Sequence, residues 1–78
     1  MSLLRKRKKI KGKTYEIQYD GVCKAFELIG PFPPSGSVPK IYENDADTIE
    51  EAEKKANRVL GTEGKWKDQP TEETKFQG

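Results

Sequence analysis

The stretch that decides the fold of this chain is KTYEIQYDGVCKAFELI, residues 13–29. Its first part alternates between apolar and polar side chains, and the apolar ones are Tyr15, Ile17 and Tyr19. A period of two is typical of a strand with one buried face. Asp20 and Gly21 predict a two-residue type I′ turn, because both residue types tolerate positive φ. The stretch therefore predicts a β-hairpin whose second strand covers residues 22–29.

A two-residue turn also fixes the register of this hairpin. The expected cross-strand pairs are Tyr19 with Val22, Ile17 with Lys24, Tyr15 with Phe26 and Lys13 with Leu28. The opposite face would present Thr14, Glu16, Gln18, Cys23, Ala25 and Glu27. Nearly all the apolar side chains of both strands then share one face, so the turn and the pattern indicate the same pairing.

A proline-rich segment follows the hairpin. Residues 30–39, GPFPPSGSVP, hold four of the five prolines and predict a loop. The loop contains a nominal PxxP match at residues 31–34, which an SH3-type groove could bind. Its composition favours a stiff connector instead, with Phe32 as a core residue. A third strand is expected at residues 40–43, because Pro39 suits the beginning or the edge of a strand.

A helix is expected over residues 48–60. The phrase TIEE at residues 48–51 matches a capping box, with Thr48 as the N-cap and Glu51 reaching back to the cap amide. Gly61 is the usual left-handed terminator. The apolar stripe of this helix is narrow and consists of Ile49, Ala52, Ala56, Val59 and Leu60.

These elements predict an α+β fold, a three-stranded antiparallel sheet with one C-terminal helix packed on one face (βββα). The expected domain covers residues 13–61. Residues 1–12 would form a flexible basic arm, and residues 62–78 a flexible polar tail. The single cysteine allows no disulfide within the chain, so a core this small implies modest stability or help from a partner.

The most concentrated charge lies at residues 5–13, where seven of the nine residues are basic. The whole chain carries +2, because residues 14–78 contain eight Lys or Arg and all thirteen Asp and Glu, a net charge of −5. Closely spaced cations indicate a polyanion-binding arm, since they displace the counterions condensed on nucleic acid. A solvated tail that keeps the domain soluble is the alternative, and composition leaves both open. In either case, removal of residues 1–11 should leave the domain folded.

The acidic counterpart lies at residues 43–53, which hold six acids and no base. Glu43, Asp45 and Asp47 are spaced like alternating metal ligands, but the glycine and the distal Glu of a calcium loop are absent. A solvated face with a charge cluster at the helix start is therefore the favoured interpretation. The basic arm could also fold back onto these acids, in which case its removal would lower stability.

Catalysis is not expected, because the chain has no histidine and no activated Ser or Cys. Cys23 should be an inert thiol on the outer sheet face. A single cysteine without histidine also predicts no metal site, and nothing indicates a cofactor or a small-molecule substrate. No apolar stretch approaches the roughly 20 residues of a membrane span, and no signal-peptide pattern is present. A cytoplasmic location is expected.

The segment GKTYEIQYDG, a further strand and the helix DTIEEAEKKANRVL resemble the amino-terminal arm-site DNA-binding domain of phage and transposon tyrosine integrases. They also resemble the related plant ethylene-response domain. The resemblance covers residues 5–61 and implies a sheet that lies in the major groove, backed by one helix. This chain departs from those families in one respect, since its outer sheet face would carry Glu16 and Glu27 and no base.

The sequence therefore predicts a small non-enzymatic accessory protein that binds nucleic acid, with DNA favoured over RNA by the resemblance alone. The expected phosphate contacts are Arg5, Lys6, Arg7, Lys8, Lys9, Lys11, Lys13, Lys24 and Lys40. Trp66, between Lys65 and Lys67, could stack on a base, or dock on the domain or on a second copy. The alternative is a protein-interaction module, or a small homo-oligomer, whose partner meets the acidic region, the proline loop or the Trp66 segment.

Overall fold

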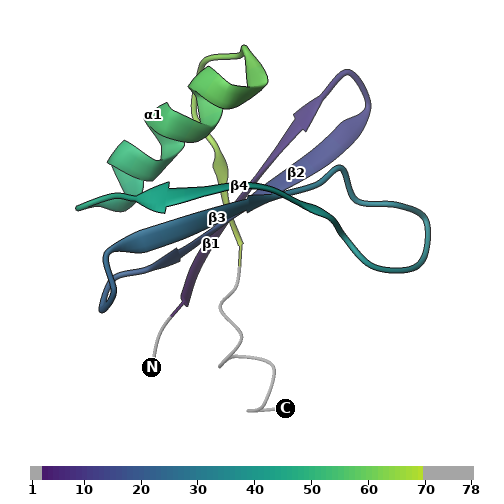
Figure 1. The fold of residues 1–78 in the computed structure, drawn as a ribbon. Coiled ribbons are helices and arrows are strands. Elements are labelled where there is room, and N and C mark those ends of the chain that lie inside the picture. The colour runs from purple at the N-terminus through teal and green to yellow at the C-terminus, as the bar shows by residue number, and fades with distance from the viewer. Residues whose placement is uncertain (1–2, 70–78) are drawn as a thin grey trace.

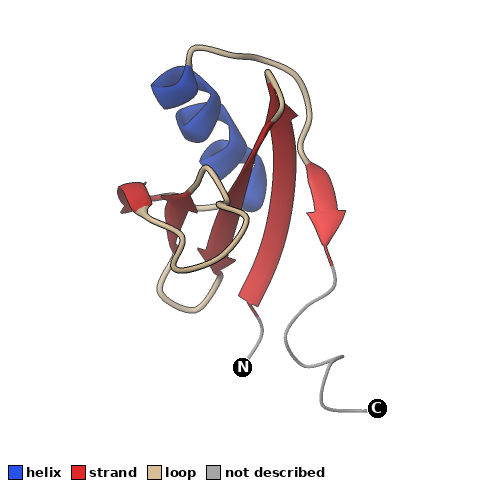
Figure 2. Cartoon of the chain, turned by 90° about the vertical axis from the view of Figure 1, so that its right-hand side faces the viewer, coloured by secondary structure: helices blue, strands red, loops and turns tan. Residues whose placement is uncertain are grey.

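The computed structural model describes residues 3–69, which form a two-layer α+β fold (Figures 1 and 2). The elements are β1 Leu3–Ile10, β2 Lys13–Asp20, β3 Ala25–Ile29, β4 Lys40–Asp45, α1 Ile49–Leu60 and β5 Lys67–Gln69. The strands make one antiparallel sheet in the order β4-β3-β2-β1-β5. The helix lies across one face, and we call the opposite face the open face. The sheet thus has five strands, and the prediction of three strands is wrong.

The main correction concerns the basic run. The expected flexible arm is strand β1, which pairs with β2 over its whole length and with β5 over Arg5 to Arg7. Its hairpin with β2 closes through Lys11 and Gly12, whose φ values of 51° and 81° are both positive. A two-residue loop with positive φ at both positions is a type I′ turn, and Gly12 adopts this conformation without strain. The type I′ turn of the molecule therefore lies before β2 and not after it.

The hairpin of β2 and β3 is confirmed as a pair, but its turn is longer than expected. Asp20 pairs with Ala25, and the Asp20 carboxylate accepts the backbone N–H of Val22 at 2.9 Å and of Cys23 at 3.3 Å. This local turn adds two residues to the loop and leaves Val22 78% exposed. The pairs become Ile17 with Leu28 and Tyr19 with Phe26. Because the register moves by an even number of residues, the side chains of residues 25–29 keep their expected faces. Val22, Cys23 and Lys24, expected in the second strand, lie in the turn instead.

The proline-rich segment is a loop, as predicted, and its base is fastened to the sheet. Gly30 N–H donates to Pro39 O, and Phe32 N–H donates to Thr14 O, both at 2.9 Å. A Cβ on Gly30, where φ is 138°, would lie 2.7 Å from the Tyr15 ring, so only glycine fits there. The third predicted strand is β4, which extends to Asp45.

Helix α1 has the predicted ends. Thr48 Oγ1 accepts the N–H of Glu51 at 3.2 Å, and the helix ends at Gly61 with φ 68°. The Glu51 carboxylate accepts the N–H of Asp47 at 3.0 Å, one residue before the cap amide that we expected. This backbone hydrogen bond, helped by the charge of Lys55, lowers the pKa of Glu51.

The core lies between α1 and the sheet. Its buried side chains are Ile17, Tyr19, Phe26, Leu28, Ala46, Ala52, Ala56 and Trp66. Trp66 is thus part of the core, and the residues after it form β5, so the expected flexible tail is wrong over residues 66–69. Residues 70–78 of that tail, with Phe76, lie outside the described residues. Val59, expected in the apolar stripe, is 41% exposed. The described part of the chain contains no helix with the length and apolar character to cross a membrane.

Candidate nucleic-acid interface

On the open face, β1 uses two of its cations to hold one buried carboxylate. Arg7 Nε lies 2.6 Å and Arg5 Nε lies 3.3 Å from the two oxygens of Glu16, whose side chain is 1% exposed. Gln18 donates to the same carboxylate at 2.6 Å. Burial opposes the ionisation of Glu16, but the hydrogen bonds from Gln18 and Arg7 and the two positive charges outweigh it and lower its pKa. The Arg7 guanidinium also lies over the Phe32 ring, 4.6 Å from its centroid.

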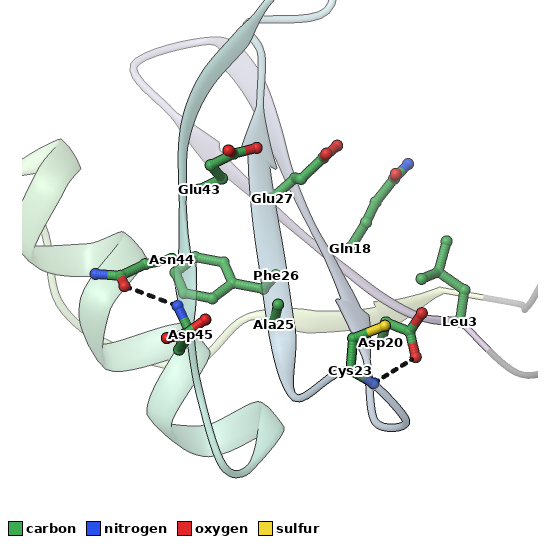
Figure 3. Close-up of a pocket in the computed structure, with 10 residues that line it drawn as sticks. All are labelled: Leu3, Gln18, Asp20, Cys23, Ala25, Phe26, Glu27, Glu43, Asn44 and Asp45. Atoms are coloured by element: carbon green, nitrogen blue, oxygen red, sulfur yellow. Dashed lines mark hydrogen bonds between the residues drawn. The ribbon is translucent and has the colours of Figure 1, made fainter.

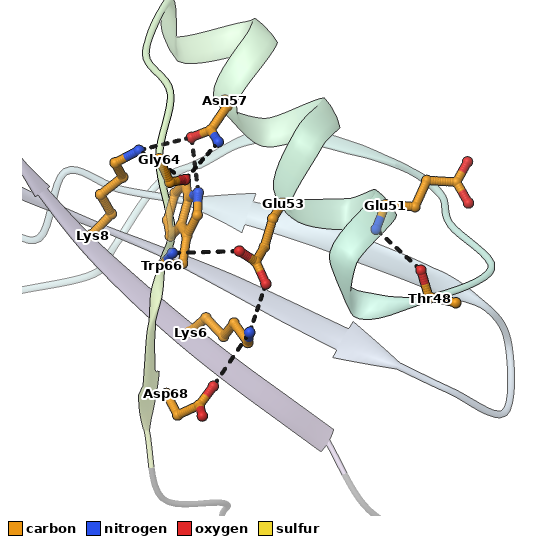
Figure 4. A network of polar contacts seen from close by, with 9 residues as sticks. All are labelled: Lys6, Lys8, Thr48, Glu51, Glu53, Asn57, Gly64, Trp66 and Asp68. Carbon is orange, nitrogen blue, oxygen red and sulfur yellow. Dashed lines mark hydrogen bonds and ion pairs between the residues drawn. The ribbon is translucent and has the colours of Figure 1, made fainter.

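On the helix face, β1 places the two alternate cations, Lys6 and Lys8, in a polar network (Figure 4). Lys6 Nζ lies 2.6 Å from Glu53 of α1 and 3.4 Å from Asp68 of β5. The hydrogen bond to Glu53 raises the pKa of Lys6, although burial opposes this. Lys8 Nζ donates to Asn57 Oδ1 at 3.0 Å and to the Glu63 carbonyl at 2.6 Å. Lys8 thereby ties α1 to the segment that leads into β5.

Trp66 completes this network. Its indole N–H donates to Asn57 Oδ1 at 2.9 Å, and Lys8 Nζ lies 5.7 Å from its ring centroid. The ring itself is buried. The possibility that Trp66 docks back on the domain is therefore confirmed, and the ring is not available to stack on a base.

Four of the nine predicted phosphate contacts, Arg5 to Lys8, thus serve as structural residues. Arg5 and Arg7 face the open side and Lys6 and Lys8 face the helix, because side chains alternate along a strand. Lys9, Lys11 and Lys13 are exposed and surround the type I′ turn. The sequence also allowed the basic run to fold back onto the acids of residues 43–53. The structure shows one such contact, between Lys6 and Glu53.

Lys9, the exposed cation of β1, belongs to a groove that the sequence did not predict. It has a volume of about 290 Å³ and is lined by Arg7, Lys8, Lys9, Thr14, Lys65 and Lys67. We call these six residues the basic groove. Lys67 pairs with Arg7, so its side chain lies on the open face beside those of β1. Its lining holds five cations and no acid. Since Arg7 is paired with Glu16 and the Lys8 ammonium meets Asn57 on the helix side, the exposed Lys9, Lys65 and Lys67 supply its positive potential.

Lys24 and Lys40, also predicted as contacts, lie away from this groove. Lys24 is in the turn between β2 and β3, at the opposite end of the sheet, with φ 54°. Lys40 begins β4, where its Nζ lies 2.8 Å from Glu43 and 3.9 Å from Glu27. The hydrogen bond to Glu43 raises the pKa of Lys40. These two lysines are not brought together with the other predicted residues.

A second hollow on the open face has the opposite charge (Figure 3). It has a volume of about 550 Å³ and carries the carboxylates of Asp20, Glu27, Glu43 and Asp45 around the apolar residues Leu3, Ala25 and Phe26. We call it the acidic pocket. In Figure 3, Gln18, Glu27 and Glu43 extend to the same side of the sheet, whereas Asn44 points toward the helix. The prediction of acids on the outer face of β2 and β3 is thus confirmed for Glu16 and Glu27.

The described residues, 3–69, contain no group of three or more His, Cys, Asp or Glu placed to hold a metal ion. The Cys23 thiol is free and exposed in the turn after β2. Three comparisons, with protein-family models, with curated proteins and with solved structures, found no match for this chain. The site must therefore be judged on its charges and geometry.

Proposed function

We propose that this protein is a small non-enzymatic nucleic-acid-binding protein that contacts phosphates through its basic groove. The observation that carries the proposal is a groove whose lining holds five cations and no acid, three of which, Lys9, Lys65 and Lys67, are exposed. Lys11 and Lys13 are exposed at the nearby end of the hairpin, where Lys13 alternates onto the face of the sheet that carries the helix. Such a surface gains affinity from the release of counterions that are condensed on a polyphosphate.

The rigid placement of these cations supports the proposal over a solvated tail. Lys9 and Lys67 project from paired strands, so they lose little backbone entropy when they meet a phosphate. Their neighbour Arg7 is already held by Glu16 and by the Phe32 ring. Phosphate contacts position a protein without reading bases, so binding should depend little on sequence. Duplex DNA is favoured over RNA by the integrase resemblance alone.

The test measures fluorescence anisotropy of a labelled DNA duplex over a series of salt concentrations. Five engaged cations, Lys9, Lys11, Lys13, Lys65 and Lys67, predict a slope of log K against log salt of about −4.5. The triple variant K9A/K65A/K67A should flatten the slope by about 2.7 and weaken binding at low salt. An RNA duplex of equal length, measured in parallel, tests the preference for DNA.

The matched control is K24A/K54A/R58A, which removes three exposed cations elsewhere. It changes the net charge by the same amount and should leave the slope unchanged. Equal losses in both triple variants would show that net charge, rather than the groove, causes binding. A slope near zero for the unchanged protein would refute phosphate binding altogether.

A further inference from the structure

The open face carries its two charged hollows at opposite corners. Thr14, at the beginning of β2, lines the basic groove, and Asp20, at its end, lines the acidic pocket. Six residues of strand separate these positions, about 20 Å. The groove lies over β1 and β5, whereas the pocket lies over β3 and β4. The two patches are therefore displaced both along and across the strands.

The charge changes in an ordered way across the sheet. One row of paired residues runs from β4 to β1 through Glu43, Glu27, Gln18 and Arg5. The next row ends in Glu16, Arg7 and Lys67. Acid thus gives way to base from one edge of the open face to the other. Within the described residues, no helix covers this face (Figures 1 and 2).

We infer that the open face docks on the open face of a second copy of this chain, with each basic groove against the acidic pocket of the partner. A two-fold axis parallel to the face and midway between the two patches produces both contacts at once. The interface is isologous and closes at two copies. Because the patches lie on a diagonal, the strands of the two copies cross steeply, near the orthogonal class of sheet packing.

Charge complementarity indicates that the partner is a second copy of this chain. In the dimer, the acidic pocket of one copy lies against the basic groove of the other copy. The pocket supplies the carboxylates of Asp20, Glu27, Glu43 and Asp45. Lys40 neutralises only part of this acid, through Glu43 and Glu27. Exposed charge pairs are screened by salt, so the dimer should form at low salt and dissociate as salt is added. This inference does not depend on nucleic-acid binding, although both use the basic groove.

Charge reversal on the full chain tests the inference by sedimentation equilibrium at low salt, without nucleic acid. E43K/D45K places lysines at the pocket, and K65E/K67E places glutamates at the groove. Each variant alone should associate more than about tenfold more weakly than the unchanged protein, because like charges then face each other. An equimolar mixture of the two should restore a dimer, since both contacts become complementary again.

The matched control is E50K/E63K, which has the same net charge as E43K/D45K but leaves the open face unaltered. It should retain more self-association than E43K/D45K and should pair less well with K65E/K67E. A strict monomer at low salt, assemblies larger than two, or equal behaviour of the control and E43K/D45K would overturn the inference. E43K/D45K retains the basic groove, so it should still bind DNA if the proposed function holds, which separates the two ideas.

Discussion

The two parts of the basic run, residues 5–8 and residues 9–13, have different roles although both consist mainly of Lys and Arg. In the first part, Arg5 to Lys8, every side chain meets a carboxylate, an amide or a carbonyl of another element. In the second part, Lys9, Lys11 and Lys13 are exposed. Both parts are rich in charge, with four cations in the four residues 5–8 and three in the five residues 9–13. What separates a structural lysine from a candidate phosphate contact is thus the set of neighbours that the fold supplies.

The largest expected effect comes from removing the basic run as a whole. Deletion of residues 1–11 removes β1, which lies between β2 and β5, and leaves Glu16 and Glu53 without their cations. We expect the truncated chain to be unfolded by circular dichroism, because a small domain has only a few kcal/mol to lose. This reverses the expectation from the sequence. The variant K9A/K11A/K13A, which changes only the exposed part, should keep the native spectrum, and a folded truncation would contradict the structural role of β1.

The next effect tests the buried carboxylate of the first part. Glu16→Ala removes the buried carboxylate that Arg7 and Arg5 share, and we expect a loss of about 3 kcal/mol in urea unfolding. Glu43→Ala, which removes an exposed carboxylate of the same face, should shift the unfolding midpoint little. Equal effects in the two variants would show that the Glu16 cluster contributes no more than a surface pair.

The same carboxylate predicts a dependence on pH. The pKa of Glu16 is lower in the folded protein than its ordinary value of 4.5. Its contribution to stability is therefore fully present above pH 4.5 and is lost as the pH falls through the lowered pKa. Glu16→Gln should remove this part of the acid destabilisation, as followed by thermal unfolding between neutral and acidic pH.

The sequence predicted the fold best at elements that are determined by residues close together along the chain. The caps of α1 are adjacent to their partners along the chain, so Thr48 and Gly61 are found from the sequence. The pairing of β2 and β3 follows from their alternation. The turn between them does not, because Asp20 accepts two N–H groups and replaces a two-residue turn by a longer one.

Contacts between distant residues explain what the sequence did not show. A run of like charges argues against a strand unless acids and carbonyls surround it, and here they come from β2, α1 and the loop after α1. Lys65 and Lys67 join the basic groove only because β5 pairs with β1. Their alternation around Trp66 was the available signal, since polar and apolar side chains alternate along a strand with one buried face.

The smallest expected effect separates stability from binding within the exposed part. Lys11 has φ 51°, a left-handed conformation that costs a lysine about 1 kcal/mol. Asn-Gly is the preferred pair for a type I′ turn, so Lys11→Asn should raise the free energy of unfolding by about 0.5 kcal/mol. The same change removes one cation from the nucleic-acid surface and should flatten the salt slope by about 0.9.

The control for this variant is Lys13→Asn, which removes an equal charge from the first position of β2, outside the turn. It should flatten the slope equally without stabilising the protein. Stability and binding would then change in opposite directions at Lys11, as expected of a residue whose side chain serves a ligand at some cost to the fold. If Lys11→Asn changed neither the free energy of unfolding nor the salt slope, Lys11 would neither strain the turn nor contact phosphate.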